Sequence, residues 1–173
     1  METTKHRLLL AIIEQLNRHG SLTGKTHLQK TAFLLDAAKK MKMPFKFVLY
    51  KHGPYSFDIE SDLQEMRSYG AIDSVSGTGY GVTLKPSQNA EWLKKQAVLT
   101  EEQERQIERM CEFVRDRNVT ELERLATAAW IRTEEHMMDP ERIALRLHEL
   151  KPHISVVEAL QADNEIAPIL CLA

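Results

Sequence analysis

Apolar residues recur at helical spacing along most of the chain, which predicts a mainly helical protein. A first helix is expected over residues 3–19 and a second over residues 25–42. The lysines that close the second helix suit the negative end of its dipole. A functional basic patch is the alternative explanation for these lysines. The inward faces are expected to hold Leu9, Ile12, Ile13, Leu16, Leu28, Ala32, Leu35 and Ala38.

The pattern changes over residues 45–84. Residues 45–50 predict a short strand, and the sequence His52-Gly53-Pro54-Tyr55 predicts a sharp turn. A helix over residues 57–69 follows, with Ser56 as its N-cap and Gly70 at its C-terminus. Residues 71–75 and 80–84 predict a hairpin with a glycine-rich tip at 76–79. A helix followed directly by such a hairpin is typical of the second half of a winged-helix unit.

Helix start signals dominate the rest of the chain. Capping boxes are expected at Thr100–Gln103, Thr120–Glu123 and Ser155–Glu158, and Asp139-Pro140 supplies an N-cap and a first-turn proline. The apolar tail over residues 166–172 is expected either to dock on the body or to cover a partner. We therefore predict a mainly α fold with a small β-hairpin: a winged-helix-like core over residues 1–86 and a helical extension over residues 87–173, packed on that core.

Composition narrows the classes of function. The 173 residues are 43% hydrophobic and 28% charged, typical of a globular protein, with no apolar run of transmembrane length. We therefore expect no membrane partner. Two cysteines and the absence of a signal-peptide pattern favour a reducing cytoplasm. The net charge is −2, with +5 on residues 1–99 and −7 on residues 100–173, so the two parts are expected to differ in electrostatic role.

The outward face of the helix over residues 57–69 is acidic. It is expected to carry Ser61, Gln64, Glu65 and Ser68 and to be flanked by Asp58, Glu60, Asp62 and Arg67, which makes four acids to one base. A helix that reads DNA lies against phosphates and usually brings cations to them. We therefore predict a non-enzymatic regulatory module, similar to an antitoxin or adaptor, that contacts another protein or a second copy in a homodimer. The expected contact residues are Lys51, His52, Tyr55, Asp58, Asp62 and Glu65.

A DNA-binding transcriptional regulator is the alternative. It would bind through the second helix or the hairpin and leave the acidic helix turned away. The cations available for phosphate contacts are Lys25, Lys30, Lys39, Lys40, Lys42 and Lys46.

An enzyme is the remote alternative, because the sequence shows no nucleophile with a base, no nucleotide loop and no metal-ligand spacing. Among the seven histidines, the candidate metal-binding pairs are His148 with His153 and His19 with His27. Neither pair has a cysteine or an acid at ligand spacing, so we expect no catalytic residues, no metal and no cofactor. Cys111 lies on an apolar helix face and is expected to pack as a small hydrophobic residue.

Three segments carry a resemblance to a known family. They are Leu28-Gln29-Lys30, the turn Tyr50-Lys51-His52-Gly53-Pro54-Tyr55-Ser56, and Leu150-Lys151-Pro152-His153-Ile154. Together with Asp62-Leu63 and Gly70-Ala71-Ile72, they resemble YwgA-like prokaryotic proteins, relatives of the Panacea or SocA-like antitoxin domains. The resemblance covers roughly residues 5–160. It implies a winged-helix-like core, a helical extension, and regulation or toxin neutralisation through macromolecular contact.

Overall fold

The computed structural model describes residues 3–21, 23–39, 41–76 and 81–171. These residues form eight helices and two antiparallel two-stranded sheets. Their order is α1 (Thr3–Arg18), α2 (Lys25–Ala37), β1 (Val48–Tyr50), β2 (Gly53–Tyr55), α3 (Phe57–Ser68), β3 (Ile72–Ser76), β4 (Val82–Pro86), α4 (Ala90–Gln96), α5 (Glu101–Val114), α6 (Val119–Thr133), α7 (Pro140–Leu150) and α8 (Val156–Cys171).

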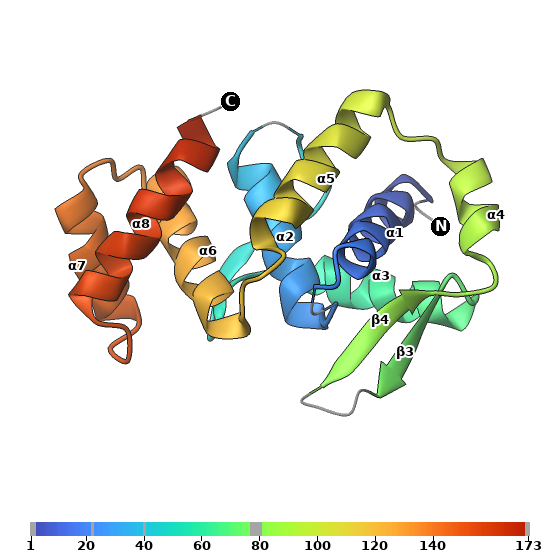
Figure 1. Ribbon diagram of the computed structural model, residues 1–173, viewed down its shortest axis with the longest axis horizontal. Helices are drawn as coiled ribbons and strands as arrows, with labels where there is room; N and C mark the ends of the chain where they lie inside the picture. The colour runs from blue at the N-terminus through green and yellow to red at the C-terminus, as the bar shows by residue number, and fades with distance from the viewer. Residues whose placement is uncertain (1–2, 22, 40, 77–80, 172–173) are drawn as a thin grey trace.

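The helices surround one continuous buried core. Helices α6, α7 and α8 gather at one end of the molecule and α1, α3 and α4 at the other, with α2 and α5 between them (Figure 1). Helix α2 packs against α5 and α6, and Phe33 meets the ring of Trp130 at 5.9 Å between centroids. The prediction of a mainly helical fold with a small hairpin is confirmed. The division at residue 86 stays a prediction.

The second helix is shorter than predicted. Helix α2 ends at Ala37, and Lys39 adopts a left-handed conformation with φ 53°. The Asp36 carboxylate accepts a hydrogen bond from the Met43 amide at 2.9 Å, which holds the chain in a turn back toward the helix end. The prediction that Lys39 and Lys42 close the helix is therefore wrong, and no described basic residue lies in its last turn. Lys40 lies outside the described residues.

The predicted turn at residues 52–55 contains a second strand. Strand β2 pairs antiparallel with β1, in the register Val48 to Tyr55 and Tyr50 to Gly53. Gly53 has φ +84°, so the glycine supplies the left-handed residue that lets the chain reverse. The reversal is therefore tighter than the sequence indicated, and it places the turn beside α2 and α6.

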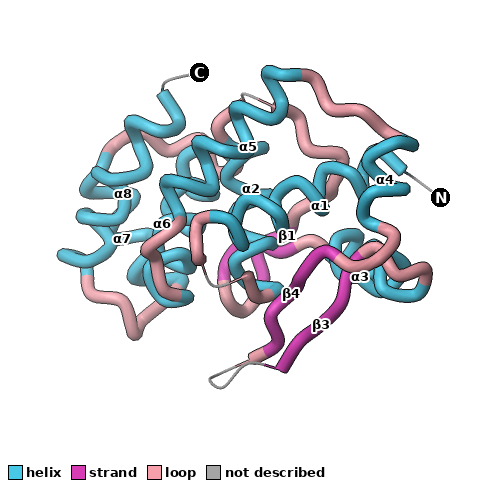
Figure 2. The backbone as a smooth tube through the Cα atoms, turned by 45° about the vertical axis from the view of Figure 1, so that its right-hand side comes forward, coloured by secondary structure: helices cyan, strands magenta, loops and turns pink. Residues whose placement is uncertain are grey.

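Helix α3 and the hairpin behave as predicted where the structure describes them. The Ser56 hydroxyl accepts a hydrogen bond from the Ile59 amide at 3.4 Å, and Gly70 has φ 72° at the C-terminal end. Strands β3 and β4 project from the body (Figure 2), held to it through buried Ile72 and Leu84. Residues 77–80, which include most of the predicted tip, lie outside the described residues.

Local side-chain chemistry begins each of four C-terminal helices. The Thr100–Gln103 capping box, the Asp139 cap and the Ser155–Glu158 box are confirmed. The box predicted at Thr120 is wrong. Asn118 caps α6 instead, because its side chain accepts from the Glu121 amide while Glu121 accepts from the Asn118 amide.

The apolar tail continues α8 up to Cys171. Ile166 is fully buried, and Ile169 and Leu170 pack partly buried against the core. The described part of the tail therefore docks on the body, which was one of the two predicted outcomes. Cys111 is buried as expected, and burial raises the pKa of its thiol to about 12. Across the described residues, every helix is either too short or too polar to traverse a lipid bilayer.

Candidate binding site

The turn over residues 51–56 lies against helix α6 at van der Waals distance. A Cβ on Gly53 would fall 2.9 Å from the Thr127 hydroxyl oxygen and 3.6 Å from the Lys30 amine. Thr127 cannot easily move away, because it is fully buried and donates to the Glu123 carbonyl at 2.7 Å. Gly53 is therefore required both for its backbone conformation and for the close approach of the two segments.

Lys30 supports the turn from helix α2. Its side chain is only 2% exposed, and the amine donates to the Pro54 carbonyl at 2.7 Å. Burial lowers the pKa of Lys30 to about 8, and the nearby Glu123 carboxylate opposes that change. A single buried lysine thus donates to a backbone carbonyl of strand β2.

Glu123 and Lys151 complete the support from the C-terminal helices. They form a buried ion pair at 2.7 Å, and the Lys151 amine also donates to the Lys51 carbonyl. On the solvent side, His52 Nδ1 lies 3.7 Å from the other Glu123 oxygen. We call Lys30, Glu123 and Lys151 the clamp. Buried charges that are paired and hydrogen-bonded in this way hold the backbone in one geometry.

Gln29 fixes the junction between the turn and helix α3. Its amide donates to the Ser56 carbonyl and accepts from the Ser56 amide, both at 2.9 Å. Both residues are buried, so the pair of hydrogen bonds is shielded from water. These hydrogen bonds fix the position of the start of α3 against α2. They therefore also fix the distance between the side chains of the turn and that of Phe57, the first residue of α3.

Three aromatic rings stand on this rigid support. Tyr50 and Phe57 are 58% and 60% exposed, and Tyr55 is half-buried between them. The ring centroids lie 5.1–5.8 Å apart with tilted or edge-to-face geometry. We call these three residues the aromatic ridge. Tyr50 and Tyr55 of the ridge line a groove of about 520 Å³, together with Lys25, Thr26, Gln29, Lys30, His52, Gly53 and Glu60.

The structure divides the predicted partner-binding residues into two groups. Lys51 and His52 are exposed on the turn beside half-buried Tyr55. Asp58 and Glu65 are exposed on α3, whereas Asp62 is half-buried and faces His6 of α1. The predicted outward face of α3 is confirmed, because Ser61, Gln64, Glu65 and Ser68 are all exposed.

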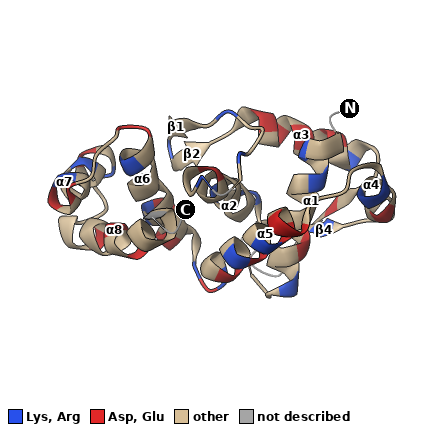
Figure 3. Ribbon diagram, turned by 90° about the horizontal axis from the view of Figure 1, so that it is seen from above, with Lys and Arg blue, Asp and Glu red and all other residues tan. Residues whose placement is uncertain are grey.

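The predicted nucleic-acid lysines do not act as one group. Lys30 is buried, so the prediction that it could meet a polyanion is wrong. Lys25 is half-exposed and pairs with Glu60. Lys39, Lys42 and Lys46 are exposed, and Lys40 lies outside the described residues. Acidic and basic residues both occur along α5 and α7 (Figure 3).

Sequence reasoning missed Gln29, Glu123 and Lys151 as site residues. Gln29 and Lys151 lie in segments that carry the family resemblance, so that resemblance was a usable signal. Glu123 carries no such signal, because the sequence indicated only a role in a capping box with Thr120. Its burial depends on the approach of a turn that is distant in sequence.

Comparison of the sequence with models of known protein families gives no match, and a search of curated proteins gives none at a significant level.

Proposed function

We propose that the protein is a non-enzymatic regulatory binding module that holds a polypeptide segment of another protein, or of a second copy, at the aromatic ridge. The observation that carries the proposal is the pair of largely exposed rings, Tyr50 and Phe57, on a backbone fixed by a buried clamp. Aromatic anchors of this kind supply most of the free energy at protein interfaces and lose little side-chain entropy on binding. The cytoplasm is the compartment that fits the sparse cysteine content.

The resemblance to YwgA-like and Panacea or SocA-like proteins supports the same proposal. Its three segments supply Gln29 and Lys30, the turn itself, and Lys151, and these residues meet around one backbone reversal. A family defined by a binding surface would retain the residues that shape that surface. The antitoxin-like or adaptor-like role therefore remains the interpretation we favour.

Site-specific photocrosslinking tests the proposal. A benzophenone amino acid at position 57, in the cells that produce the protein, is expected to trap one defined polypeptide or a second copy. The matched control is position 145, because Leu145 on α7 is similarly apolar and 54% exposed. With the trapped partner purified, Tyr50→Ser should weaken binding at least tenfold, whereas Leu145→Ser should not. Identical products from positions 57 and 145 would contradict the proposal.

DNA binding is the second candidate, favoured by one observation. Two helices, a short sheet, a third helix and a hairpin follow one another in an order compatible with a winged helix. The acidic first turn of α3 and the burial of Lys30 reduce the support for it. Mobility shifts over a salt series separate the two functions. A steep salt dependence that Lys42→Gln and Lys46→Gln both reduce would favour DNA, and a flat series would favour a polypeptide.

Catalysis has less support than either binding function. A lysine with a pKa of about 8 is chemically suited to act as a nucleophile. However, the Lys30 amine already donates to the Pro54 carbonyl and lies within the protein. A structural role accounts for both its burial and its hydrogen bond.

A further inference from the structure

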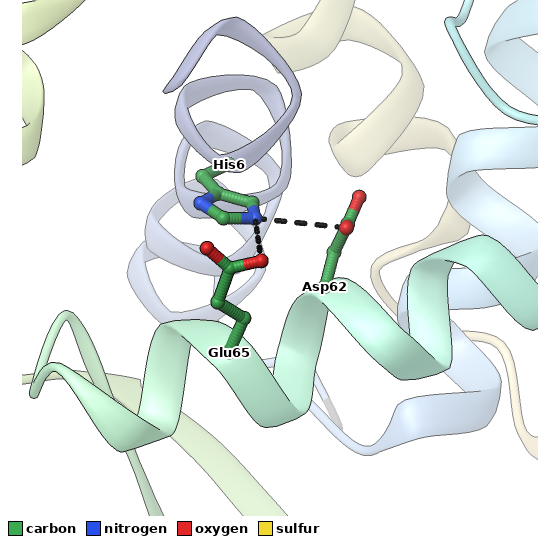
Figure 4. A group of neighbouring side chains, drawn as sticks. All are labelled: His6, Asp62 and Glu65. Atoms are coloured by element: carbon green, nitrogen blue, oxygen red, sulfur yellow. Dashed lines mark ion pairs between the residues drawn. The ribbon is translucent and has the colours of Figure 1, made fainter. Parts of the chain in front are cut away.

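Three potential ligand side chains meet where helices α1 and α3 pack together, away from the aromatic ridge. His6 lies in the first turn of α1, and Asp62 and Glu65 lie three residues apart on one face of α3 (Figure 4). One nitrogen of the imidazole and one oxygen of each carboxylate all lie within 4.8 Å of one another. His6 is more than fifty residues from the two acids in sequence.

The imidazole of His6 is fully buried and has one unused nitrogen. Its Nδ1 lies 3.0 Å from the Tyr69 hydroxyl. Its Nε2 has no hydrogen-bond partner among the residues that the structure describes, and it points toward the two carboxylates. A buried polar atom without a hydrogen bond is rare, because leaving it unsatisfied costs roughly 1–3 kcal/mol. Some interaction is therefore missing at Nε2.

The distances around Nε2 suit a bridging cation better than direct hydrogen bonds. Nε2 lies 3.6 Å from Asp62 Oδ1 and 3.8 Å from Glu65 Oε2. A hydrogen bond to nitrogen spans roughly 2.7–3.2 Å. Two ligands on a tetrahedral Zn²⁺, each about 2.0–2.1 Å from the metal, lie about 3.3 Å apart. A shift of about half an ångström by the partly exposed Glu65 side chain would bring its Oε2 to that spacing from Nε2.

We propose that His6 Nε2, Asp62 and Glu65 bind a first-row divalent transition ion, with Zn²⁺ as the best representative of the class. One imidazole and two carboxylates form a donor set that such ions accept. Glu65 is 48% exposed, so solvent reaches the site and water can complete the coordination. The ion joins α1 to α3 and thereby stabilises the packing of the acidic helix on the core.

Tyr69 occupies the position of an orienting residue. When its hydroxyl oxygen accepts from Nδ1–H, the Nε2 lone pair is free for a metal. The ring of Tyr69 lies 5.8 Å from the imidazole, which restricts rotation of His6. The arrangement resembles that of other metal-bound histidines, whose second nitrogen is held by a hydrogen bond.

Calorimetric titration of the untagged, chelator-treated protein with Zn²⁺ tests the site. We expect saturable binding of one equivalent, a rise in melting temperature, and a tetrahedral Co²⁺ absorption spectrum when Co²⁺ replaces Zn²⁺. Glu65→Gln should weaken Zn²⁺ binding at least tenfold, and because the side chain is half-exposed the variant should fold. Asp58→Asn, which removes an exposed acid from the same helix, should leave the affinity unchanged.

Surface binding by other histidines is checked with His153→Ala, because His153 is exposed on a loop. Unchanged affinity in this variant supports the proposed site. The proposal is overturned if neither Zn²⁺ nor Co²⁺ binds saturably, if Glu65→Gln binds as tightly as the wild type, or if His153→Ala abolishes binding. Any of these results would leave the His6 ring in direct contact with the two carboxylates, without a bridging ion.

Discussion

Gly53 shows how much one residue contributes to the candidate binding site. Its φ of +84° costs any other residue roughly 1 kcal/mol, and a methyl group there would lie 2.9 Å from Thr127 Oγ1. We therefore expect Gly53→Ala to lower the free energy of unfolding by about 2–4 kcal/mol, the excess coming from overpacking.

Gly20→Ala is the matched control for this prediction. Gly20 has φ +70°, and a Cβ there would meet nothing within 4 Å. The free energy of unfolding of this variant should fall by only about 1 kcal/mol, the cost of the left-handed backbone conformation alone. Urea denaturation of both variants measures the difference. Equal losses would show that Thr127 and Lys30 do not restrict the turn.

Lys30 makes stability depend on pH in a defined direction. Burial lowers its pKa to about 8 from 10.5, so between these values the unfolded chain binds more protons than the folded chain. The destabilisation is complete below pH 8 and is relieved as the pH rises toward 10.5. Relative to Lys30→Met, the wild type should gain about 1 kcal/mol in free energy of unfolding from pH 7 to pH 9.

Denaturant midpoints of the two proteins at pH 7 and pH 9 provide the measurement. The raised pKa of Cys111 acts in the opposite direction at alkaline pH, but it is present in both proteins and cancels in the comparison. Parallel pH profiles would mean that the Lys30 amine is solvated in solution.

At the scale of elements, the start of helix α6 distinguishes two sequence interpretations. The structure places the capping box at Asn118 and Glu121, so the helix cap lies two residues before the predicted Thr120. Asn118→Ala should therefore destabilise the protein by about 1 kcal/mol, whereas Thr120→Ala should change stability by less than about 0.5 kcal/mol. Thermal denaturation of both variants measures the two losses of stability. A larger loss in Thr120→Ala than in Asn118→Ala would support the capping box predicted from the sequence.

Elements were predictable where neighbouring residues determine them. Ser56, Thr100 and Asp139 cap their helices through amides two or three residues away, so the local sequence contains both partners. Strand β2 was not predictable, because Gly53 and Pro54 disfavour strands and only pairing with β1 makes them extended.

The candidate site was predictable only where neighbouring residues determine it. The stiff turn and Tyr55 could be identified from sequence, since glycine and proline restrict the backbone locally. The clamp could not be identified from local pattern, because Lys151 and the carbonyl it binds are 100 residues apart. His6 was likewise absent from the predicted sites, because its carboxylate neighbours lie on a distant helix.

At the scale of the whole molecule, one continuous core predicts one cooperative unfolding transition. The two tryptophans report from opposite ends of the body: Trp92 in α4 packs on Tyr69, and Trp130 in α6 packs on Phe33. The variant Trp92→Phe keeps Trp130 as its only tryptophan, and Trp130→Phe keeps Trp92. In each variant, we expect unfolding followed by tryptophan fluorescence to coincide with unfolding followed by circular dichroism. Separate transitions for the two probes would instead support independent units on either side of residue 86.

The ion pair between Lys151 and Glu123 also bears on when the groove can form during translation. Lys151 also donates to the Lys51 carbonyl. Lys51 leaves the ribosome long before Lys151, which is synthesised 100 residues later. Until α7 emerges, the reversal at Gly53 lacks one of its three supports. On the proposed function, a nascent chain would therefore complete its binding groove only late in synthesis.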